Sequence, residues 1–160
     1  MRLHTLAVGS AVTVLALSGL AASTASATPA TGSVTTNPTT PLAARLAGPL
    51  KAKADGVSLK IKEDATVRHF DITYGPGATS GWHEHPGIVL AVVKSGTVTR
   101  KTKCEPTETF TVGQAFTEVG PHFVRNPGTE PAVLGITQIL PADAPAFRVD
   151  IDKPKCHRHS

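Results

Sequence analysis

The sequence predicts an all-β protein, a sandwich or barrel of short antiparallel strands. Its 160 residues include 14 Gly and 13 Pro, a content that disfavours long helices. From residue 57 onward, short runs of alternating or β-rich character are separated by turn residues. No helical pattern of about 10–15 residues lies between these runs, which excludes a parallel sheet of βαβ units. About nine strands in roughly 95 residues imply one sandwich or barrel.

Gly and Pro set the bounds of the expected strands, since both residues favour turns. The strands are expected at 57–61, 67–74, 88–93, 97–101, 108–111, 114–118, 122–126 and 132–140. The run from Ile88 to Val93 is almost continuously apolar. A fully buried strand is therefore expected there.

The N-terminus is typical of a signal peptide. Arg2 supplies a positive charge, an uncharged and largely apolar run follows from Leu6 to Leu20, and Ala25-Ser26-Ala27 has the form of a cleavage site. A membrane anchor is disfavoured because Ser and Gly interrupt the run and no charge follows before Arg45. We expect a signal peptide at 1–27 and a secreted or extracytoplasmic protein with no membrane span after cleavage.

The remaining chain divides into three parts. Residues 28–54 are rich in Thr, Ala and Pro, which is typical of a flexible spacer. The barrel is expected at 55–150, and a tail at 151–160 carries Cys156. The two cysteines, Cys104 and Cys156, form an even count in a chain expected to be exported, so we expect one disulfide between them.

The net charge of +4 is mildly basic. Lys and Arg are scattered in short groups, such as Lys51/Lys53 and Lys60/Lys62, and no aromatic residues interleave with them. This pattern favours a solvated surface and argues against nucleic acid as a partner.

Three of the seven histidines form a pattern. His83 and His85 are two residues apart, and in a strand both imidazoles would lie on one face with Glu84 on the other. His122 stands at the start of another expected strand, which a closed barrel could bring opposite the first two. Two or three neutral imidazoles on one face are a ligand set for a transition metal.

The residues around these histidines resemble the motifs of the cupin superfamily. The pattern Gly-x5-His-x-His-x3-4-Glu-x6-Gly is matched by Gly77, His83, His85 and Gly96. The pattern Gly-x5-Pro-x-Gly-x2-His-x3-Asn is matched in part by Gly113, Gly120, His122 and Asn126. The resemblance covers about residues 57–140 and implies an antiparallel double-sheet jelly-roll β-barrel with the histidines in a pocket at one end. It also allows a homodimer.

The chain departs from these motifs twice. Val89 and Leu90 stand where the family places its metal-binding glutamate, so no carboxylate is expected on that strand. The second motif is two residues shorter between Gly113 and His122 and has Val119 in place of a proline. The missing glutamate ligand has three replacement candidates, Glu84, Gln114 and Glu118. No geometric argument supports them, since Glu84 should face away from the histidines and the other two lie a strand earlier than His122.

The resemblance implies one divalent transition metal bound by His83, His85 and His122. Imidazole ligands suit Zn, Cu, Fe or Ni, with Mn added by the resemblance, and make Mg and Ca poor candidates. The alternative is a degenerate, metal-free cupin whose histidines only form hydrogen bonds in a binding pocket.

Two functions follow from the resemblance: a protein that binds a small ligand at the metal, or a dioxygenase or isomerase acting on a small oxygenated molecule. No general acid or base can be placed in the pocket from the sequence, which favours binding. A serine hydrolase is disfavoured by the lack of a Gly-x-Ser-x-Gly elbow, and a cysteine hydrolase because both cysteines are expected in the disulfide. The sequence also lacks a phosphate-binding loop and a dinucleotide-binding fingerprint.

The other histidines and the aromatic residues have structural roles in this interpretation. His69 is expected to be an ordinary strand residue, and His157 and His159 to belong to the polar tail. The larger aromatic residues are expected in the barrel interior; they are Trp82, Phe110, Phe116 and Phe123. Alternation nevertheless puts Trp82 and Phe123 on the face opposite the histidines.

Overall fold

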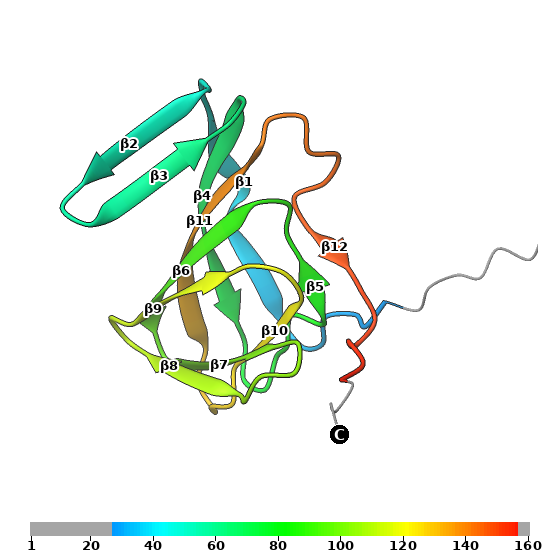
Figure 1. The fold of residues 1–160 in the computed structure, drawn as a ribbon. Coiled ribbons are helices and arrows are strands. Elements are labelled where there is room, and N and C mark those ends of the chain that lie inside the picture. The colour runs from blue at the N-terminus through cyan, green and yellow to red at the C-terminus, as the bar shows by residue number, and fades with distance from the viewer. Residues whose placement is uncertain (1–26, 157–160) are drawn as a thin grey trace, which may run out of the picture.

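The computed structural model describes residues 27–156 and consists of strands, turns and bends (Figure 1). Within this range no helix has the length and apolar character needed to cross a membrane. The expectation of an all-β, antiparallel protein is confirmed for this part of the chain. The predicted signal peptide lies outside the described residues except for Ala27.

Two five-stranded antiparallel sheets form the barrel. The first has the order β1-β4-β11-β6-β9. Its strands are β1 (Val34–Leu46), β4 (Ala65–Tyr74), β11 (Ala132–Pro141), β6 (Ile88–Ser95) and β9 (Ala115–Glu118). The second has the order β12-β5-β10-β7-β8. Its strands are β12 (Val149–Asp150), β5 (His83–Glu84), β10 (His122–Arg125), β7 (Thr97–Thr102) and β8 (Glu108–Thr111).

The core lies between the two sheets, because inward side chains alternate with outward ones along each strand. The inward residues of both sheets form one apolar cluster. It contains Phe70, Tyr74, Ala78, Val89, Ala91, Val93, Val98, Phe116, Val124, Ala132, Leu134 and Ile136. Each of the eight expected strands has a counterpart whose bounds differ from the prediction by two residues or fewer.

Strand β1 corrects the expected boundary of the barrel. Residues 34–46 were expected to belong to the flexible spacer, but β1 pairs with β4 from Val34↔Tyr74 to Leu46↔Ala65. Pro38 and Pro41 are tolerated because β1 is an edge strand and the register shifts between Asn37 and Leu42. The barrel sheet therefore begins at Val34.

Strand β6 also differs from its prediction. The apolar run was expected to be buried on both faces, but burial alternates along it. Val89, Ala91 and Val93 are buried in the core, whereas Ile88, Leu90 and Val92 are about half exposed, at 44–45%. An apolar run therefore does not establish burial of both faces, since an outward face can also carry apolar residues.

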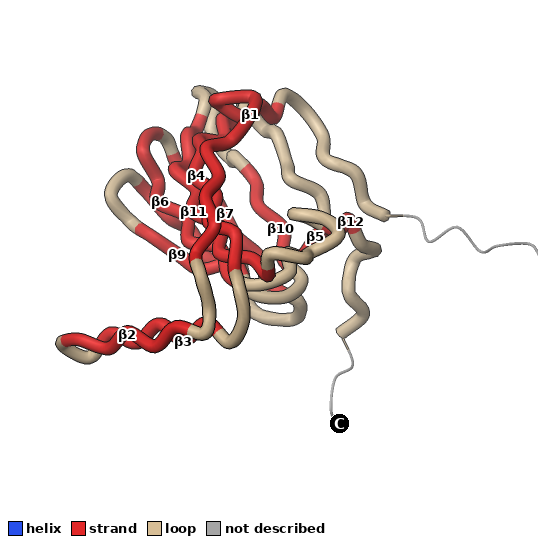
Figure 2. The backbone as a smooth tube through the Cα atoms, turned by 90° about the horizontal axis from the view of Figure 1, so that it is seen from above, coloured by secondary structure: helices blue, strands red, loops and turns tan. Residues whose placement is uncertain are grey.

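A separate hairpin projects from the barrel (Figures 1 and 2). It consists of β2 (Leu50–Ala54) and β3 (Val57–Ile61), which pair with each other and with no other described strand. The turn between them is Asp55-Gly56.

The C-terminal segment is fixed against the second sheet. β12 pairs with β5, with Val149 opposite Glu84 and Asp150 opposite His83. Beyond it, the expected disulfide links Cys156 to Cys104, which follows β7. A disulfide is typical of exported proteins.

Asn126, at the end of the second motif, connects three chain segments. Its side-chain nitrogen donates to the carbonyl oxygens of Glu130, Tyr74 and Gly75 at 2.7, 3.0 and 3.1 Å. Its side-chain oxygen accepts from the Gly128 amide at 2.9 Å. The side chain is 1% exposed, so no water can replace these partners without rearrangement.

We predict that Asn126→Ala lowers the free energy of unfolding by about 2–4 kcal/mol, because several backbone groups lose their partner inside the protein. Urea denaturation measures the change. Thr99→Ala is the matched control, since the Thr99 hydroxyl makes only an exposed 3.4 Å contact, and should cost about 0.5 kcal/mol or less. Equal effects of the two substitutions would contradict the role assigned to Asn126.

Candidate metal centre

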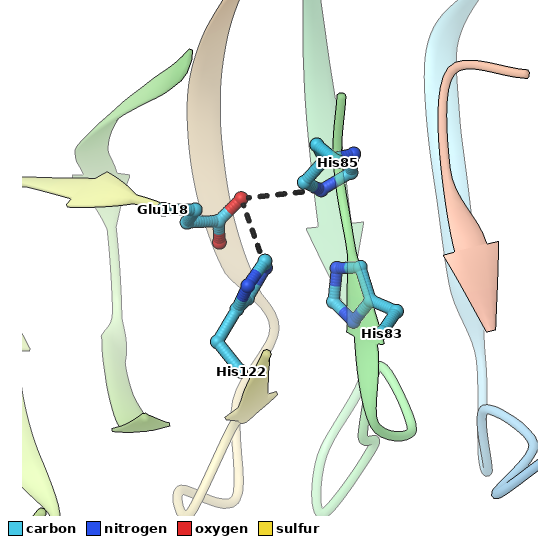
Figure 3. A group of neighbouring side chains, drawn as sticks. All are labelled: His83, His85, Glu118 and His122. Atoms are coloured by element: carbon cyan, nitrogen blue, oxygen red, sulfur yellow. Dashed lines mark ion pairs between the residues drawn. The ribbon is translucent and has the colours of Figure 1, made fainter. Parts of the chain in front are cut away.

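Strand pairing in the second sheet brings two of the histidines together. His83 on β5 and His122 on β10 are direct partners in the antiparallel register. Partners of this kind share one face of a sheet, and the two ring centroids are 4.1 Å apart. His85, two residues after His83, lies on the same side, with ring centroids 4.9 and 5.3 Å from the other two. Figure 3 shows the three rings converging on one point.

The same local arrangement precedes His83 and His122. Gly81 and Gly120 each lie two residues upstream, and each has a φ of +68°, which glycine adopts without strain. The glycine carbonyl oxygen accepts a hydrogen bond from the histidine Nδ1, at 3.0 Å for His83 and 2.7 Å for His122. A Cβ on Gly81 would also lie 2.2 Å from the Thr28 carbonyl oxygen.

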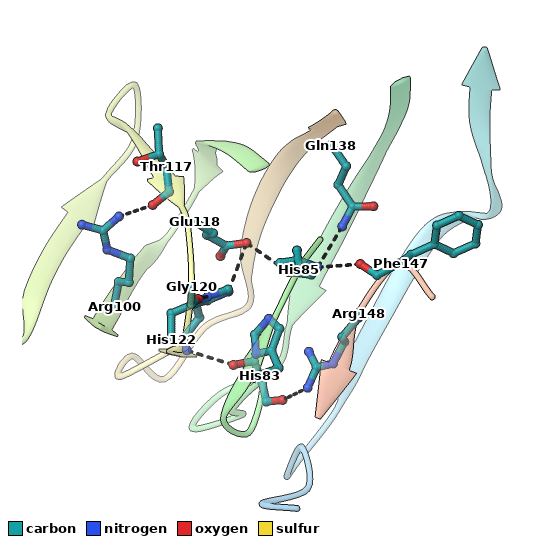
Figure 4. Close-up of polar contacts among 12 residues, drawn as sticks. His83, His85, Arg100, Thr117, Glu118, Gly120, His122, Gln138, Phe147 and Arg148 are labelled. Atoms are coloured by element: carbon teal, nitrogen blue, oxygen red, sulfur yellow. Dashed lines mark hydrogen bonds and ion pairs between the residues drawn. The ribbon is translucent and has the colours of Figure 1, made fainter. Parts of the chain in front are cut away.

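His85 is oriented from the other side of the cavity. Its Nδ1 lies 2.7 Å from the Phe147 carbonyl oxygen and 3.4 Å from the side-chain nitrogen of Gln138 (Figure 4). A carbonyl oxygen only accepts, so the shorter contact places the proton on Nδ1. All three histidines therefore have Nδ1 committed to a backbone carbonyl and Nε2 directed toward the cluster, which is the orientation of metal-binding histidines.

Glu118 completes the group. Its Oε2 lies 3.4 Å from His122 Nε2 and 3.6 Å from His85 Nε2. One ligand atom from each of the four residues lies within 4.8 Å of the other three. His83, Glu118 and His122 are at most 5% exposed. Three nitrogens and one carboxylate oxygen so close together could hold a divalent transition metal.

Glu118, one of the three replacement candidates, lies with the histidines, whereas β6 carries no carboxylate at Val89 or Leu90, as expected. Glu118 pairs directly with Val89 across β9 and β6, and Val89 stands where the cupin pattern has its glutamate. Cross-strand partners share a face, and both residues are buried. The carboxylate therefore enters the same space from the neighbouring strand.

His83 is neutral near neutral pH. Burial is the largest cause, and the nearby charges of His122 and Arg148 act in the same direction, lowering the pKa of His83 to about 3. A neutral imidazole needs no proton removed before it binds a metal.

Glu118 is charged in the same surroundings. Burial alone would raise its pKa, but the contacts with His122 and His85 outweigh burial and hold the pKa of Glu118 well below its usual range. The cluster thus contains a buried carboxylate facing imidazole nitrogens.

His122 Nε2 is the sharpest indication of a missing partner. The atom is buried, and among the described residues it has no well-aligned hydrogen bond, although Glu118 Oε2 is near. A buried nitrogen without a partner is unfavourable by about 1–3 kcal/mol. A metal ion at this point would remove that cost, so the residues fit the ion that the fold implies.

A cavity of about 220 Å³ opens beside the cluster. His83, His85 and Glu118 lie at its polar wall, together with the side chains of Arg68, Gln138 and Arg148. Apart from Thr36, mostly apolar residues form the rest of the lining. These are Val34, Phe70, Ile72, Leu134, Ile136 and Phe147, with Tyr74, whose pKa is raised by burial so that its phenol keeps its proton.

Two arginines line this cavity, and only one of them has a carboxylate partner among the described residues. Arg148 is paired with Asp150 and donates to the Ser80 carbonyl oxygen. Arg68 donates to the Gln138 side-chain oxygen at 2.8 Å and lies 3.7 Å from the centre of the Phe147 ring. Arg68 takes part in none of the ion pairs of residues 27–156. It is therefore the uncompensated cation of the cavity.

The remaining candidates lie apart from the cluster. Glu84 and Gln114 are not in it, and Gln114 instead accepts from Thr111. His69 is exposed and contacts the Thr137 hydroxyl, as expected of an ordinary strand residue. His157 and His159 lie outside the described residues.

The aromatic residues divide into two groups. Phe116 belongs to the core and Phe110 packs against it, as predicted. Trp82 and Phe123 lie outside the core cluster and pack on each other with ring centroids 5.9 Å apart. Trp82 is nevertheless buried, at 5% exposed, and Phe123 is half-buried. Alternation places both on the face opposite the histidines, as expected.

The chain matches no protein-family model and no curated protein. It is similar to several solved structures. A cupin-like protein from Thermotoga maritima is 18% identical with a TM-score of 0.46, and the match covers 54% of this chain and 65% of that one. An oxalate oxidase in complex with the substrate analogue glycolate is 20% identical with a TM-score of 0.46, over 53% of this chain and 46% of that one.

A third structure is the Cupin_2 domain of an XRE family transcriptional regulator from Enterobacter cloacae. It is 30% identical with a TM-score of 0.40, and the match covers 46% of this chain and 80% of that domain. The chain is thus similar to cupin-like proteins and to a Cupin_2 domain.

One part of the site was only a candidate in the sequence, and another was not named. Glu118 could have been singled out from the alternation of β9, which puts Phe116 and Glu118 on the buried face. Arg148 and the Phe147 carbonyl come from a segment with no strand pattern in the sequence, and nothing local indicates that it lies over the histidines.

We predict that the stability of the metal-free protein falls as the pH is lowered. An unfolded chain takes up a proton on His83 below about pH 6.5, whereas the folded chain does so only near pH 3. The free energy of unfolding should therefore fall by up to about 1.4 kcal/mol per pH unit below pH 6.5. Urea denaturation in chelator between pH 7 and pH 5 measures this slope while Glu118 remains charged.

His83→Gln provides the comparison, because glutamine does not titrate. The variant should show a shallower slope whatever its absolute stability. An unchanged slope would mean that His83 is protonated in the folded protein.

Proposed function

We propose that this protein is an exported cupin that binds one divalent transition metal through His83, His85, Glu118 and His122 and a small carboxylate beside it. The observation that carries the metal proposal is the common orientation of the three imidazoles. Each Nδ1 donates to a carbonyl oxygen, which leaves three Nε2 atoms as ligands.

The ligand set also bears on the choice of metal. Three imidazoles suit Zn, Cu, Fe and Ni, and a carboxylate extends the set toward Mn. Mg and Ca, which prefer oxygen ligands, are disfavoured. When bound, the ion would supply positive charge and coordination positions open to the cavity.

We predict about one equivalent of metal in the chain ending at Cys156, which lacks the tail histidines. The His83→Ala/His85→Ala variant should lose it, because half of the ligand set is removed. Glu118→Gln keeps the shape of the side chain but not its charge, and should weaken affinity by about 100-fold. Elemental analysis and calorimetric titration measure these effects.

His69→Ala is the matched control, since His69 is exposed and outside the cluster. Metal retained by the double variant, or lost equally from His69→Ala, would overturn the proposed site. Absence of metal after reconstitution would instead support the metal-free alternative.

The proposed ligand follows from the charge and size of the cavity. The cavity is small and mostly apolar, with Arg68 at the polar wall. Gln138 accepts from Arg68 and its nitrogen lies against His85, so the arginine and the metal ligands share one wall. A small carboxylate could contact both the guanidinium and a bound metal.

We predict that Arg68→Gln weakens binding of small carboxylates such as glycolate and oxalate to the metal-loaded protein by at least about tenfold, since a charged hydrogen bond is lost. Calorimetry with ethylene glycol as the uncharged comparison measures the preference. Arg45→Gln is the control, because Arg45 pairs with Asp64 on the exposed surface. Equal affinity for the diol would refute the carboxylate proposal.

Turnover is the second candidate function. The observation that favours it is Tyr74, a buried phenol that lines the cavity and keeps its proton. It supplies the proton donor that sequence reasoning could not place. Oxygen consumption and product formation over a panel of diols, diketones and carboxylates test this, with Tyr74→Phe and His122→Ala expected to abolish any turnover.

A further inference from the structure

The β2–β3 hairpin has two chemically different faces. Antiparallel pairing places Lys51 opposite Lys60 and Lys53 opposite Ser58, and Lys62 continues the same face by alternation. The other face carries only apolar residues, paired across the two strands. They are Leu50 with Ile61, Ala52 with Leu59, and Ala54 with Val57.

The lysine face is exposed and lacks partners within the described chain. All four lysines are exposed, and the ion pairs of residues 27–156 include none of them. Like charges directly opposite one another destabilise a hairpin, and a two-stranded hairpin is only marginally stable. The arrangement is therefore unfavourable in isolation and favourable beside negative charge.

The apolar face is incompletely covered. Near the base of the hairpin, Leu59 and Ile61 line a groove with the exposed Ile88 of β6 and with Pro141. Toward the tip the face is open, and Val57 is 73% exposed. Figure 2 shows the hairpin extending away from the barrel, so its tip can approach a flat surface without the barrel intervening.

We propose that the β2–β3 hairpin binds the surface of an anionic lipid bilayer. A segment with one lysine-rich face and one apolar face is suited to the membrane interface, where apolar residues enter the headgroup region and lysines extend toward anionic headgroups. A soluble polyanion would use the lysines but leave the apolar face in water. The membrane is therefore the partner that accounts for both faces.

This role is independent of the proposed metal function. The hairpin contributes no residue to the cavity or to the histidine cluster. Surface binding would place the barrel beside the bilayer without inserting a spanning segment.

The test is sedimentation with phosphatidylcholine vesicles, with and without phosphatidylglycerol, using the chain from residue 28. This chain contains every described residue except Ala27 and omits the apolar run that would itself bind lipid. We expect binding only to the anionic vesicles and loss of binding at high salt. Substituting Lys51, Lys53, Lys60 and Lys62 with Gln should weaken it by about 100-fold.

Two further variants separate charge from structure. Substituting Lys94, Lys101, Lys153 and Lys155 with Gln removes the same charge elsewhere and should leave most of the binding intact. Val57→Ser should weaken vesicle binding by roughly fivefold through lost apolar contact, with no effect on binding to inorganic polyphosphate.

Each outcome decides the proposal. Selective, salt-sensitive binding that depends on both faces supports it. The proposal would be overturned by an absence of binding to anionic vesicles, or by an equal loss of binding in the two lysine variants. It would also be overturned if the protein bound polyphosphate and vesicles equally and Val57→Ser had no effect. Circular dichroism, measured in parallel, reports whether each variant retains the folded barrel.

Discussion

The direct pairing of His83 with His122 across β5 and β10 is the contact on which the site depends. Because the two residues are cross-strand partners, their imidazoles share one face whatever the side chains around them. The two Gly-x-His segments then fix the rings, since each glycine carbonyl orients the histidine that follows it. The backbone thus defines the positions of His83 and His122. Glu118, at the end of β9, and His85, directly after β5, complete the cluster.

Most of the strands could be predicted from the alternation of apolar and polar residues in the sequence. Period-two patterns and turn residues are local, so strands such as β3 and β8 were predicted with the bounds that the structure has. Register and edge position are not local. Glu118 could not be singled out among the three candidates because its role depends on standing opposite Val89 in another strand. Strand β1 was missed because its prolines are acceptable only at a sheet edge.

The C-terminal segment shows how a short element can serve the site. β12 has only two residues, yet it pairs with the strand that carries His83, and the preceding Phe147 carbonyl orients His85. The Cys104–Cys156 disulfide anchors the chain beyond it. The orientation of one histidine therefore depends on a segment about 60 residues away, held by pairing and a covalent link.

The two departures from the cupin motifs meet in one segment. The carboxylate has moved from the position of Val89 to Glu118, at the end of β9, and the connection from Gly113 to His122 is two residues shorter than the pattern. Glu118 and His122 are separated only by Val119-Gly120-Pro121, and the chain bends at Gly120, which has a positive φ. We interpret the departures as one change: a tighter turn brings the last residue of β9 to the histidines, so a carboxylate on β6 is no longer required and Val89 can join the core.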